Sequence, residues 1–133
     1  MSPKTLPRHE ITLMLDDIRE ERGGKFSLIG LYTQDIIVEA LPAMMSKLCL
    51  FTRMKGGEGT FSVKFSIKDP NGDELLSRFT PFNMTAREGY SHVNFMVSPF
   101  GINHEGRYDL KMYLDDELFY EMSFFVKKAK VLN

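Results

Sequence analysis

The chain has 133 residues, of which 43% are apolar and 26% are charged. These values lie near globular averages and exclude a disordered chain, and the length suits one domain with its own core. A net charge of -1 leaves no excess of cations for a phosphate backbone, so nucleic-acid binding is not expected. We expect one domain over residues 1–133, with a non-helical arm at residues 1–8 that contains Pro3 and Pro7.

The cysteine content and the length of the apolar runs indicate in which cellular compartment the protein resides. Cys49 is the only cysteine, so no internal disulfide forms, which suits a reducing environment. No apolar run has the length of a signal peptide core or of a membrane span. The sequence therefore predicts a cytoplasmic protein that does not bind membranes.

The first thirty residues contain one strand pattern and one short helical candidate. Ile11, Leu13 and Leu15 alternate with Thr12, Met14 and Asp16, which favours a strand. The charged residues 16–22 precede two glycines, so we expect a turn or a single helical turn there. Residues 26–32 form a predicted strand whose phase changes at Gly30, which indicates a bulge.

The next segments are short strands joined by a glycine-rich connection. Residues 36–38 are predicted as a short edge strand, whereas residues 47–54 are apolar on both faces. The latter pattern fits a central strand or a strand that lies under a loop. Residues 56–59 lack the Lys-Ser/Thr of a phosphate loop and lead into a strand, so we expect a hairpin connection.

Residues 60–68 give the clearest strand, because apolar and polar side chains alternate with a period of two. The apolar face consists of Phe61, Val63, Phe65 and Ile67. A three-residue loop at residues 70–72, with a bulge at Gly72, places Lys68 opposite Glu74 and Ile67 opposite Leu75. Residues 92–97 alternate in the same way, with Val93, Phe95 and Val97 as the apolar set.

Residues 107–114 and 118–126 form a predicted C-terminal hairpin. A three-residue loop at residues 115–117 pairs Leu110 with Met122 and Lys111 with Glu121, whereas a two-residue loop mixes core and solvent positions. About eight short strands with frequent turn signals predict an all-β fold. We expect an antiparallel β-sandwich of immunoglobulin-like architecture.

Two segments resemble known families. Residues 105–110 resemble the G-x-Y-x-Leu pattern of an immunoglobulin-like penultimate strand, which implies a tyrosine corner at Tyr108 and a core position for Leu110. The chain has no paired cysteines and no tryptophan, so only the sandwich architecture is implied. The pattern D-x-x-x-E-x-x-G-K-x-x-x-x-G, from Asp17 to Gly30, and the closing G-x-Y and D-x-E-L segments are similar to a bacterial family of unknown function. That resemblance covers nearly the whole chain and implies a bacterial source, but no activity and no functional residues.

Residues with reactive or metal-binding side chains show no pattern of a known site. Cys49 lies in an apolar strand without a nucleophile signature, and the three histidines lack metal-ligand spacing. The acidic residues near position 18 lack the spacing of a calcium loop. These residues are His9, His92, His104, Asp16, Asp17, Glu20 and Glu21. We expect no catalytic, cofactor or metal residues, and thus a protein that is not an enzyme.

Apolar residues on strand faces that should be exposed to solvent are the most informative feature for function. In the predicted C-terminal hairpin, Tyr113 and Phe119 pair on the outer face and Phe125 lies further along it. Met44 and Met45 lie in a proline-containing loop. Internal packing, cover by the N-terminal arm and contact with another chain are all open explanations.

The leading hypothesis is therefore a protein-interaction module that binds a protein partner or a second copy of itself. The alternative is a β-sandwich that binds a small ligand or a carbohydrate through loops at one end. The aromatic residues for that alternative are Tyr32, Phe82, Tyr90 and Phe100.

Overall fold

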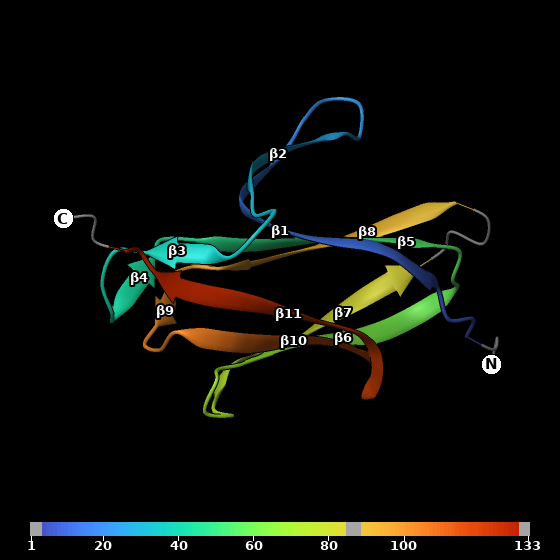
Figure 1. Ribbon diagram of the computed structural model, residues 1–133. Helices are drawn as coiled ribbons and strands as arrows, with labels where there is room; N and C mark the ends of the chain where they lie inside the picture. Colours follow the sequence, from blue (N-terminus) through green and yellow to red (C-terminus); the bar gives the residue numbers. More distant parts are fainter. Residues whose placement is uncertain (1–3, 85–88, 131–133) are drawn as a thin grey trace.

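A computed structural model describes residues 4–84 and 89–130 of the chain (Figure 1). These residues form strands and no helix. The strands are β1 (Arg8–Glu20), β2 (Phe26–Leu31), β3 (Ile36–Val38), β4 (Ala43–Met45), β5 (Leu48–Lys55), β6 (Gly59–Lys68), β7 (Glu74–Met84), β8 (Tyr90–Val97), β9 (Phe100–Ile102), β10 (Gly106–Leu114) and β11 (Glu117–Lys128).

The strands form two layers that face each other (Figure 1). One sheet has the order β2-β1-β5-β8 and the other the order β3-β11-β10-β6-β7, while β4 and β9 make a small ribbon at one end. All strand pairs are antiparallel except β3 with β11. The predicted all-β sandwich is confirmed, with β5 as a central strand and β3 as a short edge strand.

The core lies between the two sheets and is built from strictly alternating strands. The four apolar residues of β6 are each at most 2% exposed, and so is every second residue of β10. The β10 set is Tyr108, Leu110, Met112 and Leu114. From the facing sheet, Phe95 packs its ring 4.8 Å from that of Phe65. Each such buried side chain contributes roughly 1.5–3 kcal/mol, so β6 and β10 hold the sandwich together.

The tyrosine corner is present as predicted. The Tyr108 side chain is fully buried and its Oη–H donates a 2.7 Å hydrogen bond to the backbone carbonyl of His104. The ring stacks on Phe124 with a centroid distance of 5.2 Å. The bond ties the loop after β9 to the start of β10 and satisfies the one polar atom that this large side chain buries.

The C-terminal hairpin has both of its expected pairs and the β6–β7 hairpin has one of two, because the extra residues lie at other positions than predicted. Leu110 pairs with Met122 and Lys111 with Glu121, as predicted. The turn, however, has two residues, Asp115 and Asp116, with φ of 50° and 66°. These values match the strand twist, and a bulge in β11 takes up the odd residue.

The bulge in β11 changes the face of its first residues. Tyr113 pairs with Leu118 and Met112 with Tyr120, so Phe119 has no direct partner and the predicted Tyr113–Phe119 pair is wrong. In the β6–β7 hairpin, Lys68 pairs with Glu74 as predicted, but Ile67 pairs with Leu76 instead of Leu75 because a second register shift follows the loop.

Three predictions about the chain path are also wrong. Residues 16–20 form no turn, because β1 continues as a strand to Glu20 and the turn begins only at Arg22. Residues 56–59 join β5 to β6 in the opposite sheet, so they form a crossover between layers and no hairpin. Gly30 has φ of 71°, but the pairs Leu15–Leu31 and Asp17–Ile29 keep one register, so no bulge is present.

The N-terminal arm packs against the rest of the domain from Lys4 onward. Its first three residues lie outside the described residues. Thr5 and Glu58 exchange two backbone hydrogen bonds of 2.9 Å, and the Lys4 ammonium lies 2.7 Å from the Asp115 carboxylate. Pro7 is buried. The arm therefore closes the end of the sandwich at the β5–β6 crossover.

The corner bond makes a testable contribution to stability. Tyr108→Phe keeps the ring but leaves the His104 carbonyl without its donor, so we expect the free energy of unfolding to fall by about 1 kcal/mol. Tyr113→Phe, a half-buried tyrosine on the outer face of β10, should change it by less than about 0.5 kcal/mol. Urea unfolding of both variants measures the difference, and equal losses would contradict a structural role for the corner.

Candidate functional site

The two outer faces of the sandwich differ in chemistry. The outer face of β10 and β11 is polar, with Arg107 Nε–H donating to Asp109 at 3.0 Å and Ser123 Oγ–H donating to the same carboxylate at 2.8 Å. These bonds help to hold the pKa of Asp109 below its usual value, with Ser123 the largest cause. The outer face of β1 and β5 is more apolar and includes the cross-strand pairs Leu13–Phe51 and Leu15–Cys49. This asymmetry directs attention to the four-stranded sheet.

Leu15 and Cys49 form the centre of that apolar outer face. They are paired across β1 and β5, and their neighbours Met14, Leu48 and Leu50 belong to the sandwich core. Successive side chains of a strand point to opposite faces, so Leu15 and Cys49 point away from the core. They are nevertheless 0% and 2% exposed. Another part of the chain must cover them.

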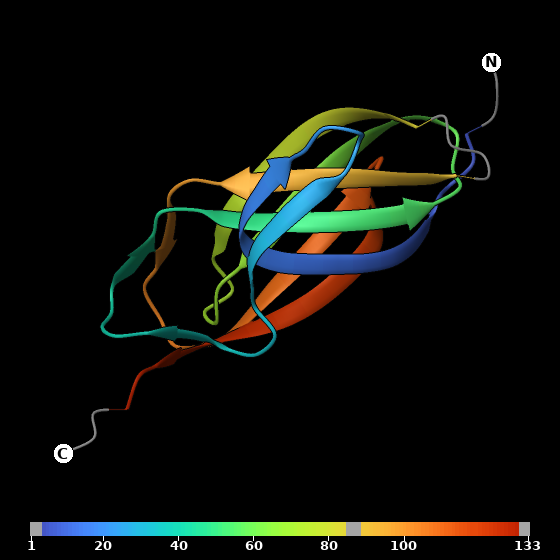
Figure 2. The ribbon, with the colours of Figure 1, turned by 90° about the horizontal axis from the view of Figure 1, so that it is seen from above.

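The β1–β2 hairpin supplies this cover. The pairing of β1 with β5 ends at Leu15, whereas its pairing with β2 continues to Glu20. Beyond Leu15 the hairpin leaves the sheet, rises above it and crosses over β5 and β8 (Figures 1 and 2). Phe26, at the start of β2, reaches the sheet again, with its ring 4.5 Å from His92 and 6.0 Å from Phe51.

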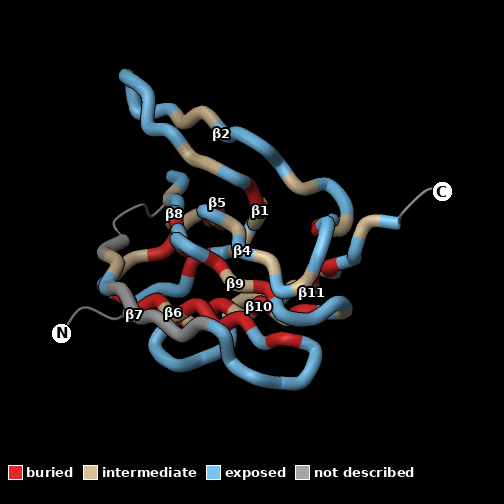
Figure 3. Tube along the Cα trace, turned by 90° about the vertical axis from the view of Figure 1, so that its left-hand side faces the viewer, coloured by how far each residue is buried: buried red, intermediate tan, exposed pale blue. Residues whose placement is uncertain are grey.

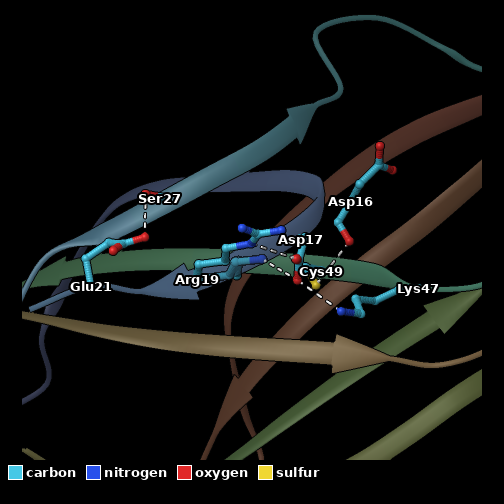
Figure 4. Close-up of polar contacts among 8 residues, drawn as sticks. Asp16, Asp17, Arg19, Glu21, Ser27, Lys47 and Cys49 are labelled. Carbon is cyan, nitrogen blue, oxygen red and sulfur yellow. Dashed lines mark hydrogen bonds and ion pairs between the residues drawn. The ribbon is translucent and has the colours of Figure 1, made fainter.

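Polar contacts fasten the base of the hairpin to β5 (Figure 4). The Lys47 ammonium donates to Asp17 at 3.0 Å and Arg19 lies 3.6 Å from the same carboxylate. The hydrogen bond from Lys47 is the largest cause of the lowered pKa of Asp17. The Cys49 thiol points at the Asp16 carbonyl, 3.7 Å away, and burial raises its pKa. The thiol therefore stays protonated at neutral pH and is a poor nucleophile.

A cavity of about 200 Å³ remains between the hairpin and the sheet. It is lined by Asp17, Ile18, Glu20, Phe26, Cys49, Asn94, Phe95 and Met96. Sites for drug-sized ligands begin at about 300 Å³. This cavity therefore has room for a single side chain or a few water molecules, and it does not fit a sugar or a cofactor.

The far end of the hairpin depends on the absence of a side chain at Gly30. A Cβ at this position would overlap the Asp16 carboxylate, whose Cγ would lie 2.7 Å away. The carboxylate accepts a 2.6 Å hydrogen bond from Tyr32 Oη–H. Burial and then this bond raise the pKa of Tyr32 to about 12. Gly30 thus lets Asp16 of β1 lie over the C-terminal end of β2.

Strand β2 exposes more aliphatic surface than its neighbours. Among residues 4–84 and 89–130 it pairs with β1 alone, so one edge of its backbone has no strand of this part of the chain beside it. Leu28, Ile29 and Leu31 are 38%, 40% and 47% exposed, and consecutive Leu28 and Ile29 point to opposite faces. Figure 3 shows the hairpin as a mainly exposed arm beside the buried interior of the sandwich. Sequence analysis missed this surface, although the run Phe26–Leu31 contains neither a charge nor a proline.

The five residues predicted as an interface lie in different environments. Met44 and Phe125 are 69% and 44% exposed, so both present apolar surface to solvent. Met45 and Phe119 pack against the core, and Tyr113 is half-buried with the Lys64 ammonium 5.4 Å from its ring. Internal packing therefore accounts for Met45 and Phe119, and only Met44 and Phe125 remain open to a partner.

The aromatic residues considered for ligand binding are not gathered in one place. Phe100 is buried in the core and Phe82 packs against it. Tyr90 is exposed, and the Arg53 guanidinium lies 3.8 Å from one face of its ring. The hollow beside Tyr32 contains none of the other three.

The histidines lie apart and each has its own contacts. His9 stacks on Tyr120 at 3.6 Å, His92 contacts Phe26, and His104 lies 3.1 Å from the Asn71 amide. Within residues 4–84 and 89–130, no three side chains of His, Cys, Asp or Glu are grouped to hold a metal ion. The same residues include no helix that is long and apolar enough to cross a membrane.

Comparison with known proteins assigns a family. Residues 10–127 match DUF6941, a family of unknown function. The chain belongs to DUF6941. This confirms the resemblance to a family of unknown function that the sequence motifs indicated. This DUF6941 chain is also similar to an immunoglobulin-like protein from Pseudomonas aeruginosa, whose crystal structure it matches with 13% identity, 92% cover of this chain, 98% cover of that chain and a TM-score of 0.44. No curated protein matches the sequence.

Gly30 can be tested against a second glycine with a similar backbone. Gly72 has φ of 84° and open space where a Cβ would lie. Gly72→Ala should therefore cost only the strain of the left-handed conformation, about 1–2 kcal/mol. Gly30→Ala should cost more, because it also displaces the Asp16 carboxylate from Tyr32. Equal losses of unfolding free energy in the two variants would show that the carboxylate contact is unimportant.

The Tyr32–Asp16 bond predicts a pH effect. The protonated phenol is favoured in the folded state, so its stabilisation is full below the ordinary pKa of 10.0 and is lost as the pH rises through about 12. Ultraviolet titration of the protein minus that of Tyr32→Phe gives the pKa of Tyr32. We expect about 12, and a lower value in Asp16→Asn. A pKa near 10.0 in the unaltered chain would contradict the bond.

Proposed function

We propose that this DUF6941 chain is a non-enzymatic protein-interaction module of the bacterial cytoplasm, and that it binds its partner through the β1–β2 hairpin. One observation carries the proposal: β2 is a proline-free, uncharged strand with three exposed aliphatic side chains and one edge that no described strand of the chain pairs with. Natural edge strands are usually short, charged or interrupted, because a flat apolar edge pairs with other chains. An edge without these protections is suited to binding.

The mode of binding follows from the hydrogen bonds that β2 leaves unused. A partner segment in extended conformation would add a strand beside β2, and its backbone would satisfy the amide and carbonyl groups of the free edge. Leu28 and Ile29 lie on opposite faces, so the partner would also bury apolar surface on both sides of the ribbon. The contacts at Lys47 and Cys49 fix the base of the hairpin, which presents β2 in one orientation.

The cavity under the hairpin gives the partner a place for one side chain. Phe26, Ile18 and Met96 supply apolar walls, and the carboxylate of Glu20 stands at the lining without an ion-pair partner among the described residues. A long side chain with an apolar stem and a cationic end matches this combination. Met44 and Phe125 lie outside the cavity lining, and we assign them no part in this binding.

A photo-crosslinking experiment tests the proposal. A photoreactive phenylalanine replaces Leu28 on β2 or, as control, Glu121 on the polar outer face of β11, and both variants are irradiated in bacterial cells that express the family member. We expect a crosslinked protein adduct from position 28 and at least tenfold less from position 121, because only the first lies in the contact. Equal yields, or no adduct from position 28, would refute binding through the hairpin.

A further inference from the structure

We infer that the β1–β2 hairpin is a hinged strap, which lifts from the four-stranded sheet as one unit while the sandwich stays folded. In the closed position the strap covers Leu15 and Cys49 and forms one wall of the cavity above the sheet. In the open position both residues and the cavity are accessible, so the strap controls entry to the cavity. This movement belongs to the chain by itself and goes beyond the binding role proposed above.

The hinge lies where the hairpin bends away from the sheet (Figure 2). Gly30 is at this bend, one residue before the Leu31 that pairs with Leu15 at the end of the β1–β5 ladder. Its φ of 71° belongs to a conformation that glycine adopts at no steric cost. When a rigid unit turns, a few such residues absorb the change in φ and ψ. Gly30 therefore provides a pivot directly beyond the last residue pair of the sheet.

Beyond the hinge, the backbone of the hairpin is bonded to itself and not to the sheet. β1 and β2 stay paired from Asp17 with Ile29 to Glu20 with Phe26. Among the described residues, no backbone hydrogen bond joins residues 17–29 to β5 or β8. The hairpin can therefore leave the sheet without breaking a strand ladder, and its own pairing makes it move as one unit.

A few side chains hold the strap closed. Near the hinge the Lys47 ammonium donates to the Asp17 carboxylate at 3.0 Å, and this ion pair is the latch. Towards the turn of the hairpin, the Phe26 ring lies 4.5 Å from that of His92. Between these contacts a cavity of about 200 Å³ separates the two surfaces, whereas protein interiors are otherwise close-packed. Segments with so few buried contacts open at a lower free energy than the rest of a domain.

Fluorescence quenching tests the strap, because the chain contains no tryptophan and Phe26→Trp adds a single probe at the contact with His92. In this background, Lys47→Met removes the latch. The control Lys127→Met removes a 2.8 Å ion pair with Asp35 in the other sheet. We expect acrylamide quenching of the tryptophan to rise roughly threefold with Lys47→Met, as for the loss of one partly exposed ion pair.

The control variant should leave the quenching unchanged, and far-ultraviolet circular dichroism should show the same folded signal for every variant. High salt should raise the quenching of the chain with the intact latch, because it screens the ion pair. Equal quenching in Lys47→Met and Lys127→Met, or quenching that rises only as the circular dichroism signal is lost, would overturn the inference.

Spin labels measure the movement without altering Phe26. One label is attached to Arg22→Cys at the turn of the hairpin and the other to Glu121→Cys on β11, with Cys49→Ser to remove the native thiol. Pulsed electron paramagnetic resonance should give two distances between the labels. The longer distance should be more populated after Lys47→Met. One distance, the same with and without the latch, would also overturn the inference.

The outcomes separate this inference from the proposed function, because both measurements use the chain without a partner. A hairpin that stays closed in all variants overturns the strap, and it leaves the crosslink expected from position 28 in cells unaffected. If no crosslink forms although the strap opens, binding through the hairpin is refuted and the hinge is still established.

Discussion

The packing of β6 and β10 against β5 and β8 is the constraint on which the rest of the structure depends. These strands place alternate side chains between the two sheets, and Tyr108, Phe61 and Phe65 are the largest of them. The corner bond of Tyr108 then fixes the chain where it enters β10. No residue of the β1–β2 hairpin between Asp16 and Leu31 belongs to the core cluster, so this part of the hairpin is available for another task.

The sequence predicted those parts of the fold that local alternation determines. β6, β8 and the pairing of Leu110 with Met122 follow from side chains two residues apart, and such patterns survive whatever lies beyond the sheet. The long strand β1 was missed because its charged end reads as a turn. Asp17 is compensated by Lys47, thirty residues away, and no local pattern shows that contact. The crossover at residues 56–59 was missed because glycines with positive φ serve hairpins and crossovers equally.

The predicted outer face of the C-terminal hairpin was only partly right for a related reason. The β11 bulge turns Phe119 onto the core, and a single-residue shift in register cannot be read from alternation on one strand. The apolar surface of the β1–β2 hairpin does have a signal in the sequence, which is the change of phase at Gly30. That change was interpreted as a bulge, but it reflects a strand that is apolar on both faces. A strand of this kind is either buried on both faces or exposes apolar side chains to solvent, and only the three-dimensional arrangement distinguishes the two cases.

The position of Cys49 makes its thiol a natural probe of how often the β1–β2 hairpin detaches from the sheet. It is the sole cysteine, it faces away from the core, and the hairpin is what shields it. Alkylation of this thiol therefore requires the hairpin to lift, an opening far smaller than global unfolding. The labelling rate at native conditions would measure how often the arm detaches, and a bound partner that holds the arm down would slow it without any engineered probe.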